Sequence, residues 1–138
     1  MPEDVFVDTS AWVALADRGE DTHTLAEEAY RDLLLQCWLV TTNLVVAEIF
    51  ILLRRHLGVA AGLRFMAAVG TSPRIHLVRS SEGLEQEAEN ILYKYRNHEL
   101  SFTDAVSFAS METCGVRRAF SFDRHFIVVG FSVVPAPV

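Results

Sequence analysis

The sequence is poor in residues on which several common classes of protein depend. It has a single lysine, Lys94, and a formal net charge of -6, which argues against a protein that coats nucleic acid through electrostatics alone. Its two cysteines, Cys37 and Cys114, lie far apart and form no C-x-x-C pair. We therefore expect two free thiols rather than a disulfide framework.

Long apolar runs and targeting signals are also lacking. The longest apolar stretch, residues 44–53, contains Glu48 and is closed by Arg54 and Arg55, so it is far shorter than the roughly 20 residues that span a bilayer. The acidic start, residues 1–4, lacks the basic and apolar regions of a signal peptide. We expect no membrane segment and a cytoplasmic location.

Several catalytic motifs are missing. The chain has no G-x-S-x-G elbow, no phosphate-binding G-x-x-x-x-G-K-[ST] loop and no dinucleotide-binding G-x-G-x-x-G turn. Its five histidines lack the spacing of a zinc pair. A phospho-receiver needs paired acids near its first strand and a late lysine, whereas Lys94 falls in a predicted helix.

The elements that are present alternate between strand and helix. Apolar segments predict strands at 5–7, 39–41, 75–78, 119–122 and 132–134, and helices at 11–16, 25–37, 44–56, 59–69, 84–95 and 103–114. Asn43 is the expected N-cap of the third helix, and Gly58 and Gly115 end helices. Such alternation predicts one domain, residues 1–138, with a three-layer α/β/α sandwich around a parallel sheet of about five strands.

Four acidic residues fall at one edge of this predicted sheet. Asp8 and Asp123 end strands, and Glu48 and Asp104 lie in early turns of helices that follow loops at the same edge. Ligands of open α/β sheets bind outside the carboxyl ends of the strands. The four carboxylates are therefore expected to face one crevice.

Each acid also has a purely structural interpretation. Asp8 is a good helix N-cap, as are Thr9 and Ser10, and Asp123 suits a turn. Asp104 follows Ser101 at capping-box spacing. Glu48 is the most informative, because its apolar helical neighbours predict a buried face on which a carboxylate needs a cation, either a distant arginine or a metal. These neighbours are Leu44, Val45, Ile51 and Leu52.

Four converging carboxylates repel one another unless a cation lies between them. Hard divalent cations that prefer oxygen ligands, Mg²⁺ or Mn²⁺, are the simplest remedy. A site of this kind suits the hydrolysis of phosphate esters, in which the metal lowers the pKa of a water and stabilises the leaving oxygen. The residues alone indicate this chemistry and no particular substrate.

Four short segments together resemble the PIN domain family, and specifically the toxin nuclease of VapBC toxin–antitoxin pairs. They are Val5-Phe6-Val7-Asp8-Thr9-Ser10, Thr41-Thr42-Asn43-Leu44-Val45-Val46-Ala47-Glu48, Leu100-Ser101-Phe102-Thr103-Asp104-Ala105 and Ser121-Phe122-Asp123-Arg124-His125-Phe126. The resemblance extends over nearly the whole chain. Each segment is weakly specific, and their order and spacing carry the match.

The resemblance implies a Mg²⁺-dependent endoribonuclease that cleaves RNA phosphodiesters with a metal-activated water. The acidic cluster would be Asp8, Glu48, Asp104 and Asp123, and the protein would be a homodimer inhibited by a small antitoxin. Ser121 stands where relatives often carry threonine and keeps a hydroxyl, which suits an auxiliary role. Arg124, beside Asp123, is the first candidate for binding the RNA.

Two other functions fit the same residues. The chain could be a PIN-type nuclease of RNA processing, or one directed at DNA, without an antitoxin. It could also be a PIN-like binding module whose acids are idle, although intact acids at all four positions count against this. A gene for a small DNA-binding protein next to this one would favour the toxin, and an absence of Mn²⁺ binding would favour the binding module.

Overall fold

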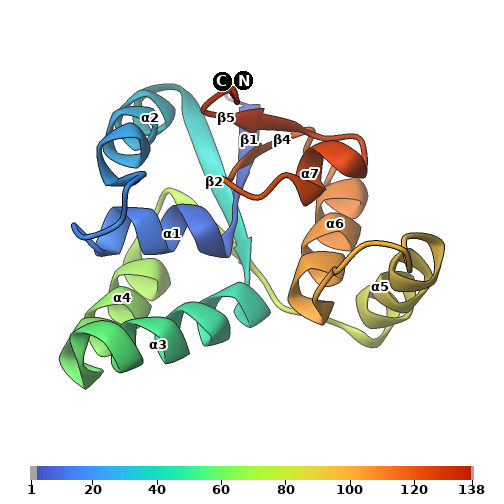
Figure 1. Cartoon of the computed structure of the whole chain (residues 1–138), viewed down its shortest axis with the longest axis horizontal. Coiled ribbons are helices and arrows are strands. Elements are labelled where there is room, and N and C mark those ends of the chain that lie inside the picture. Colours follow the sequence, from blue (N-terminus) through green and yellow to red (C-terminus); the bar gives the residue numbers. More distant parts are fainter. Residues whose placement is uncertain (1–2, 138) are drawn as a thin grey trace.

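The core of the molecule is a parallel five-stranded sheet, seen in a computed structural model that describes residues 3–137 (Figure 1). Its strands are β1 (Glu3–Val7), β2 (Cys37–Thr42), β3 (Ile75–Val78), β4 (Arg118–Phe120) and β5 (Ser132–Val134), in the order β3-β2-β1-β4-β5. All four strand pairs are parallel, which confirms the predicted sheet. Residues 1, 2 and 138 of the predicted domain lie outside the described part.

Helices cover both faces of the sheet. In Figure 1, α1 (Thr9–Ala16), α2 (His23–Gln36), α3 (Asn43–Leu57) and α4 (Val59–Thr71) lie on one side, and α5 (Glu82–Lys94), α6 (Phe102–Cys114) and α7 (His125–Val128) on the other. The predicted three-layer sandwich is therefore confirmed. Among residues 3–137, no helix is long and apolar enough to cross a membrane.

The central strand β1 is buried from both sides. Val5, Phe6 and Val7 are all fully buried, as expected for a strand of a parallel sheet that has helices on each face. Next to β1, the rings of Phe108 and Phe126 meet edge to face with their centroids 4.8 Å apart. This packing fixes the position of the carboxyl ends of β1 and β4.

Some details of the secondary structure differ from the prediction. Helix α7 was not predicted, because four residues are too few to show a helical period, and β4 ends at Phe120 rather than at residue 122. Cys37 begins β2 instead of ending a helix, because its buried side chain belongs to the core. Both cysteines are free, as expected.

The N-cap of α3 is Thr42 rather than Asn43. The Thr42 hydroxyl accepts a hydrogen bond from the Val45 amide at 3.1 Å, because the backbone of Thr42 is still extended. Asn43 instead accepts a hydrogen bond from the Ser80 amide at 2.8 Å through Oδ1. The side chain predicted as a cap thus ties α3 to the segment that leads into α5.

Gly62 allows α3 and α4 to pack closely, and we expect Gly62→Ala to destabilise the fold by about 1–3 kcal/mol through overpacking. A Cβ at Gly62 would lie 2.9 Å from Cδ2 of Phe50 and 3.4 Å from its carbonyl oxygen. Gly70→Ala in the same helix is the matched control, because a Cβ there meets nothing within 4 Å. The control should gain up to about 1 kcal/mol from helix propensity. Urea unfolding measures the stability of both variants. Equal free energies of unfolding for Gly62→Ala and Gly70→Ala would contradict this packing.

Candidate acidic active site

The predicted site lies at the switch point of the sheet. The chain runs outward from β1 through β2 to β3 and then returns to the other side of β1 with β4 and β5. In open α/β sheets a ligand is expected outside the carboxyl ends of the strands at such a point, here β1 and β4, a region that we call the acidic crevice. Asp8 follows β1 directly, and its amide donates a hydrogen bond to the Phe120 carbonyl at 3.1 Å. Ser121 follows β4, which brings its side chain to Asp8.

Two serine hydroxyls hold the buried carboxylate of Asp8. Ser10 Oγ donates to Asp8 Oδ2 at 2.8 Å, and Ser121 Oγ donates to the same oxygen at 3.0 Å. Each hydroxyl also accepts a hydrogen bond from a backbone amide of the loop after β4. Ser10 Oγ accepts from the Phe122 amide and Ser121 Oγ from the Asp123 amide, both at 2.9 Å. The start of α1 and the loop that carries Asp123 are thereby fixed to one another.

Asp8 is both a site candidate and the N-cap of α1. It accepts a hydrogen bond from the Ser10 amide at 3.4 Å, so the capping interpretation of this residue holds. Thr9 and Ser10, the other possible caps, lie inside the helix. A cap is usually exposed, whereas Asp8 is buried, and its Oδ1 accepts no hydrogen bond from residues 3–137. Capping therefore leaves part of its chemistry unused.

The pKa values of two of the acids are raised. Burial raises the pKa of Asp8 from 3.8 to about 6, the hydrogen bonds from Ser10 and Ser121 act against this, and the charge of Asp104 adds to it. Burial also raises the pKa of Asp104, and the charges of Asp123 and Glu48 raise it further, while the hydrogen bonds with Ser101 lower it. All four acids are thus linked electrostatically through Asp104.

Asp104 forms the capping box that its spacing allows, yet it also faces the other acids. Its Oδ2 accepts the Ser101 amide at 3.1 Å, and its own amide donates to Ser101 Oγ at 3.0 Å. This leaves Oδ1 without a hydrogen bond from the described residues. Asp104 also offers an oxygen within 4.8 Å of ligand atoms of Asp123 and His125. Among residues 3–137, no comparable group of three includes Asp8 or Glu48.

His125 was missed as a member of this cluster. Its Nδ1 lies 2.9 Å from Asp123 Oδ1, a close contact that lacks the direction of a hydrogen bond, while its amide donates to the same oxygen at 2.9 Å. The spacing between the five histidines does not indicate that His125 lies beside the acids. The informative spacing is Asp123-x-His125, in which a single residue lies between the acid and the histidine.

Glu48 lies near the other acids, but it is less buried than predicted. The buried face of α3 is formed by Val45, Ile49 and Leu53, whereas Ile51 is 54% exposed and Glu48 is only partly buried. The expectation of a buried carboxylate that demands a cation was therefore wrong. The apolar run of residues 44–53 lies on an amphipathic helix at the molecular surface, so it does not reveal which side chains are buried. What connects Glu48 to the crevice is its charge, which acts on Asp104.

Apart from the close contact of His125 with Asp123, the acids have no basic partner among the described residues. Within residues 3–137, neither lysine nor arginine forms an ion pair with Asp8, Glu48, Asp104 or Asp123. Carboxylates that raise each other's pKa and have free oxygens match the oxygen ligands that Mg²⁺ and Mn²⁺ prefer. The donor set thus fits a divalent cation.

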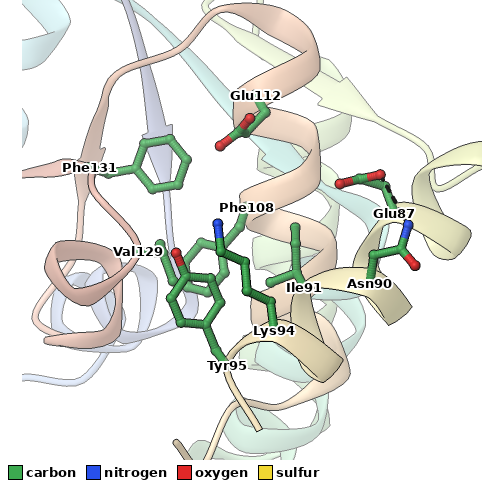
Figure 2. A pocket seen from close by; sticks show the side chains of 9 residues that line it. All are labelled: Glu87, Asn90, Ile91, Lys94, Tyr95, Phe108, Glu112, Val129 and Phe131. Atoms are coloured by element: carbon green, nitrogen blue, oxygen red, sulfur yellow. Dashed lines mark hydrogen bonds between the residues drawn. The ribbon is translucent and has the colours of Figure 1, made fainter.

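A separate cavity of about 170 Å³ lies between α5, α6 and the chain before β5 (Figure 2). Lys94 ends α5 and Tyr95 is the C-cap of that helix, whereas Phe108 and Glu112 come from α6. None of the four acids lines it, so it is not part of the acidic crevice.

Comparison with known proteins gives one consistent result. The PIN domain family model matches residues 5–132. The 23S rRNA-specific endonuclease VapC20 of Mycobacterium tuberculosis is 34% identical over 127 residues, which cover 92% of this chain and 95% of VapC20. Its crystal structure, described as a toxin that cleaves the sarcin–ricin loop, superposes with a TM-score of 0.86 at 33% identity over the same shares of both chains.

A more distant solved structure has the same fold. A toxin–antitoxin complex from Klebsiella pneumoniae contains a chain that matches with a TM-score of 0.68 at 13% identity, covering 94% of this chain and 95% of that one. At this identity the likeness concerns the fold alone.

Proposed function

The chain belongs to the PIN domain family, in its VapC branch, and we propose that it is a Mg²⁺-dependent endoribonuclease that acts as the toxin of a type II toxin–antitoxin pair. The observation that carries this proposal is the cluster of acids at the switch point, where Asp8 and Asp104 have raised pKa values and no basic partner among the described residues. Ribosomal RNA is the first substrate to test, because the relative at 34% identity is named for cleaving it.

Each acid has a separate task in this proposal. Asp8 and Asp104 hold the cation, each with a carboxylate oxygen that no described residue occupies. Asp123 completes the ligand set, and Glu48 either contributes a further oxygen or orients the attacking water. Ser121 has the auxiliary role of holding the Asp8 carboxylate and the Asp123 backbone together through its two hydrogen bonds.

A bound Mg²⁺ would lower the pKa of a water and stabilise negative charge on the leaving oxygen. Mn²⁺ is a possible substitute, because it accepts the same oxygen ligands. The chain's own contribution is to bring the carboxylates to one edge of the sheet and to bury that of Asp8. Burial of the charged Asp8 side chain destabilises the metal-free fold, and a bound cation would offset this effect.

The test is cleavage of an RNA hairpin that carries the sarcin–ricin loop sequence. We expect cleavage with Mg²⁺, none with EDTA, and recovery when Mg²⁺ or Mn²⁺ is added in excess. Mapping the new RNA ends shows whether the cut is internal. Cleavage that persists in EDTA would overturn the metal dependence, and no cleavage of this or total cellular RNA under any condition would favour an inactive binding module.

Arg124→Ala should weaken RNA binding and flatten its salt dependence. Arg124 is exposed and directly follows Asp123, so its guanidinium is placed to meet a phosphate near the acids. Losing one phosphate contact should change the slope of log K against log salt by about one. Arg55→Ala is the matched control, since Arg55 lies in the last turn of α3 and suits that helix end. An unchanged slope for Arg124→Ala would remove this residue from the binding surface.

Helices α3 and α4 offer an exposed apolar surface on which an antitoxin could bind. Ile51, Leu57 and Leu63 on these helices are each about half exposed, at 54%, 46% and 55%. We infer that a small cognate protein covers them, that the toxin is a homodimer, and that it resides in the cytoplasm, where both cysteines stay reduced. Co-purification with the product of a neighbouring gene separates this from a nuclease of RNA processing.

A further inference from the structure

A second cavity adjoins the acidic crevice. It has a volume of about 160 Å³ and lies between the first turn of α2, the loop after β4, α7 and the end of β5. Leu25, Phe122, Ile127 and Val133 form its apolar walls. Four elements that are distant in sequence thus meet around one small hollow.

The cavity shares two residues with the crevice. Ser121 and Asp123 line it, and Ser121 Oγ is the hydroxyl that bonds both Asp8 and the Asp123 amide. A molecule held in this cavity therefore lies directly beside the acids. The cavity of Figure 2, by contrast, includes none of them.

The walls select for a flat apolar group with polar edges. Carbon-rich side chains form most of the lining, which disfavours a phosphate or a bare cation, while Asp123 and Arg124 also line the cavity and add an acceptor and donors. Leu25 and Ile127 are 49% and 44% exposed, so their apolar surface is available. Proteins that read RNA commonly take an unstacked base against such surfaces and bond its edge.

We propose that this cavity receives one nucleobase of the RNA next to the cleaved bond, with Leu25 and Ile127 as walls that help to determine which nucleotide is accepted. The proposal rests on the proposed ribonuclease function. Binding of the base would place the adjoining phosphate toward Asp123, with Arg124 between base and phosphate. The cavity would then supply sequence preference that an all-carboxylate centre lacks.

The test uses Leu25→Ala and Ile127→Ala in the full-length protein. Each has a matched control nearby: Leu35→Ala on the same helix α2, where Leu35 is 82% exposed, and Val128→Ala on α7, where Val128 is 43% exposed. Neither control residue lines the cavity. Steady-state cleavage of the sarcin–ricin hairpin is measured for all four variants, with circular dichroism to verify folding.

The same assay is repeated with single abasic nucleotides placed along the loop. For the wild type, one abasic position should raise KM roughly 5- to 100-fold, the loss expected for one stacked base. Leu25→Ala and Ile127→Ala should raise KM for intact RNA, leave kcat nearly unchanged, and respond much less to that abasic position. The two controls should behave as the wild type.

Three results would overturn the inference. If the wild type cleaves RNA and all four variants have its KM, the ribonuclease stands and the base site does not. If the cavity variants stay as sensitive to every abasic position as the wild type, the cavity acts on something other than a base. If the wild type cleaves no RNA, the ribonuclease itself fails and the base site with it.

Discussion

Asp104→Asn is expected to lower the kcat for RNA cleavage by about 10²- to 10³-fold, the usual cost of removing one electrostatic contact at a reacting centre. Asp104 is the acid whose pKa responds to the charges of both Asp123 and Glu48, so it lies at the centre of the cluster. The amide oxygen of asparagine can still accept the Ser101 amide, and the capping box therefore does not explain a loss of activity.

The matched control is Glu112→Gln in the same helix. It also removes one negative charge from α6, but Glu112 is exposed and lines the cavity of Figure 2 instead of the crevice. Its kcat should equal that of the wild type. Comparable activities of Asp104→Asn and the wild type, with both proteins folded, would remove Asp104 from the proposed centre.

The second large effect concerns the stability of the metal-free protein, which should lose a contribution from Asp8 as the pH rises. The pKa of Asp8 is about 6 in the folded protein and 3.8 for the free side chain. The folded state therefore holds this proton more tightly, and the contribution of Asp8 to the free energy of unfolding falls as the pH rises from about 4 to 6. Each pKa unit corresponds to about 1.4 kcal/mol, so the full loss is about 3 kcal/mol.

Urea unfolding in EDTA measures this effect. Between pH 4.5 and 7.5, the wild type should lose about 2 kcal/mol relative to Asp8→Asn, which keeps the shape of the side chain and has no proton to release. Saturating Mn²⁺ at pH 7.5 should stabilise the wild type and have less effect on Asp8→Asn. Asp32→Asn, at an exposed acid on α2, is the control. If the free energies of unfolding of the wild type and Asp8→Asn differ by a constant amount across this pH range, the burial of an uncompensated carboxylate is contradicted.

The fold could be predicted well because its signals are local and repeated. Strands such as Val5-Phe6-Val7 are apolar throughout, and glycines such as Gly115, whose φ is 69°, mark helix ends. Helix α7 could not be predicted, because it has only four residues and depends on the hydrogen bond that the His125 amide donates to Asp123 and on the packing of Phe126.

The candidate site was predictable in part. Asp8 follows β1 and Asp104 lies in the first turn of α6, as predicted, whereas Asp123 lies in the loop after β4 and does not end the strand. Glu48 was chosen for a burial that it lacks, because an apolar run does not reveal which face of a helix meets the core. The hydroxyl of Ser10 and the side chain of His125 were overlooked, since their roles depend on contacts across more than one element.

Anomalous diffraction from crystals soaked in Mn²⁺ tests the central claim most directly, because it locates the cation without relying on a substrate. The expected result is a manganese peak in the crevice with carboxylate oxygens of Asp8, Asp104 and Asp123 among its ligands, and its loss in Asp104→Asn. A fully soaked crystal with no peak among these acids, or with peaks only elsewhere on the protein, would contradict the claim that they form a divalent-cation centre.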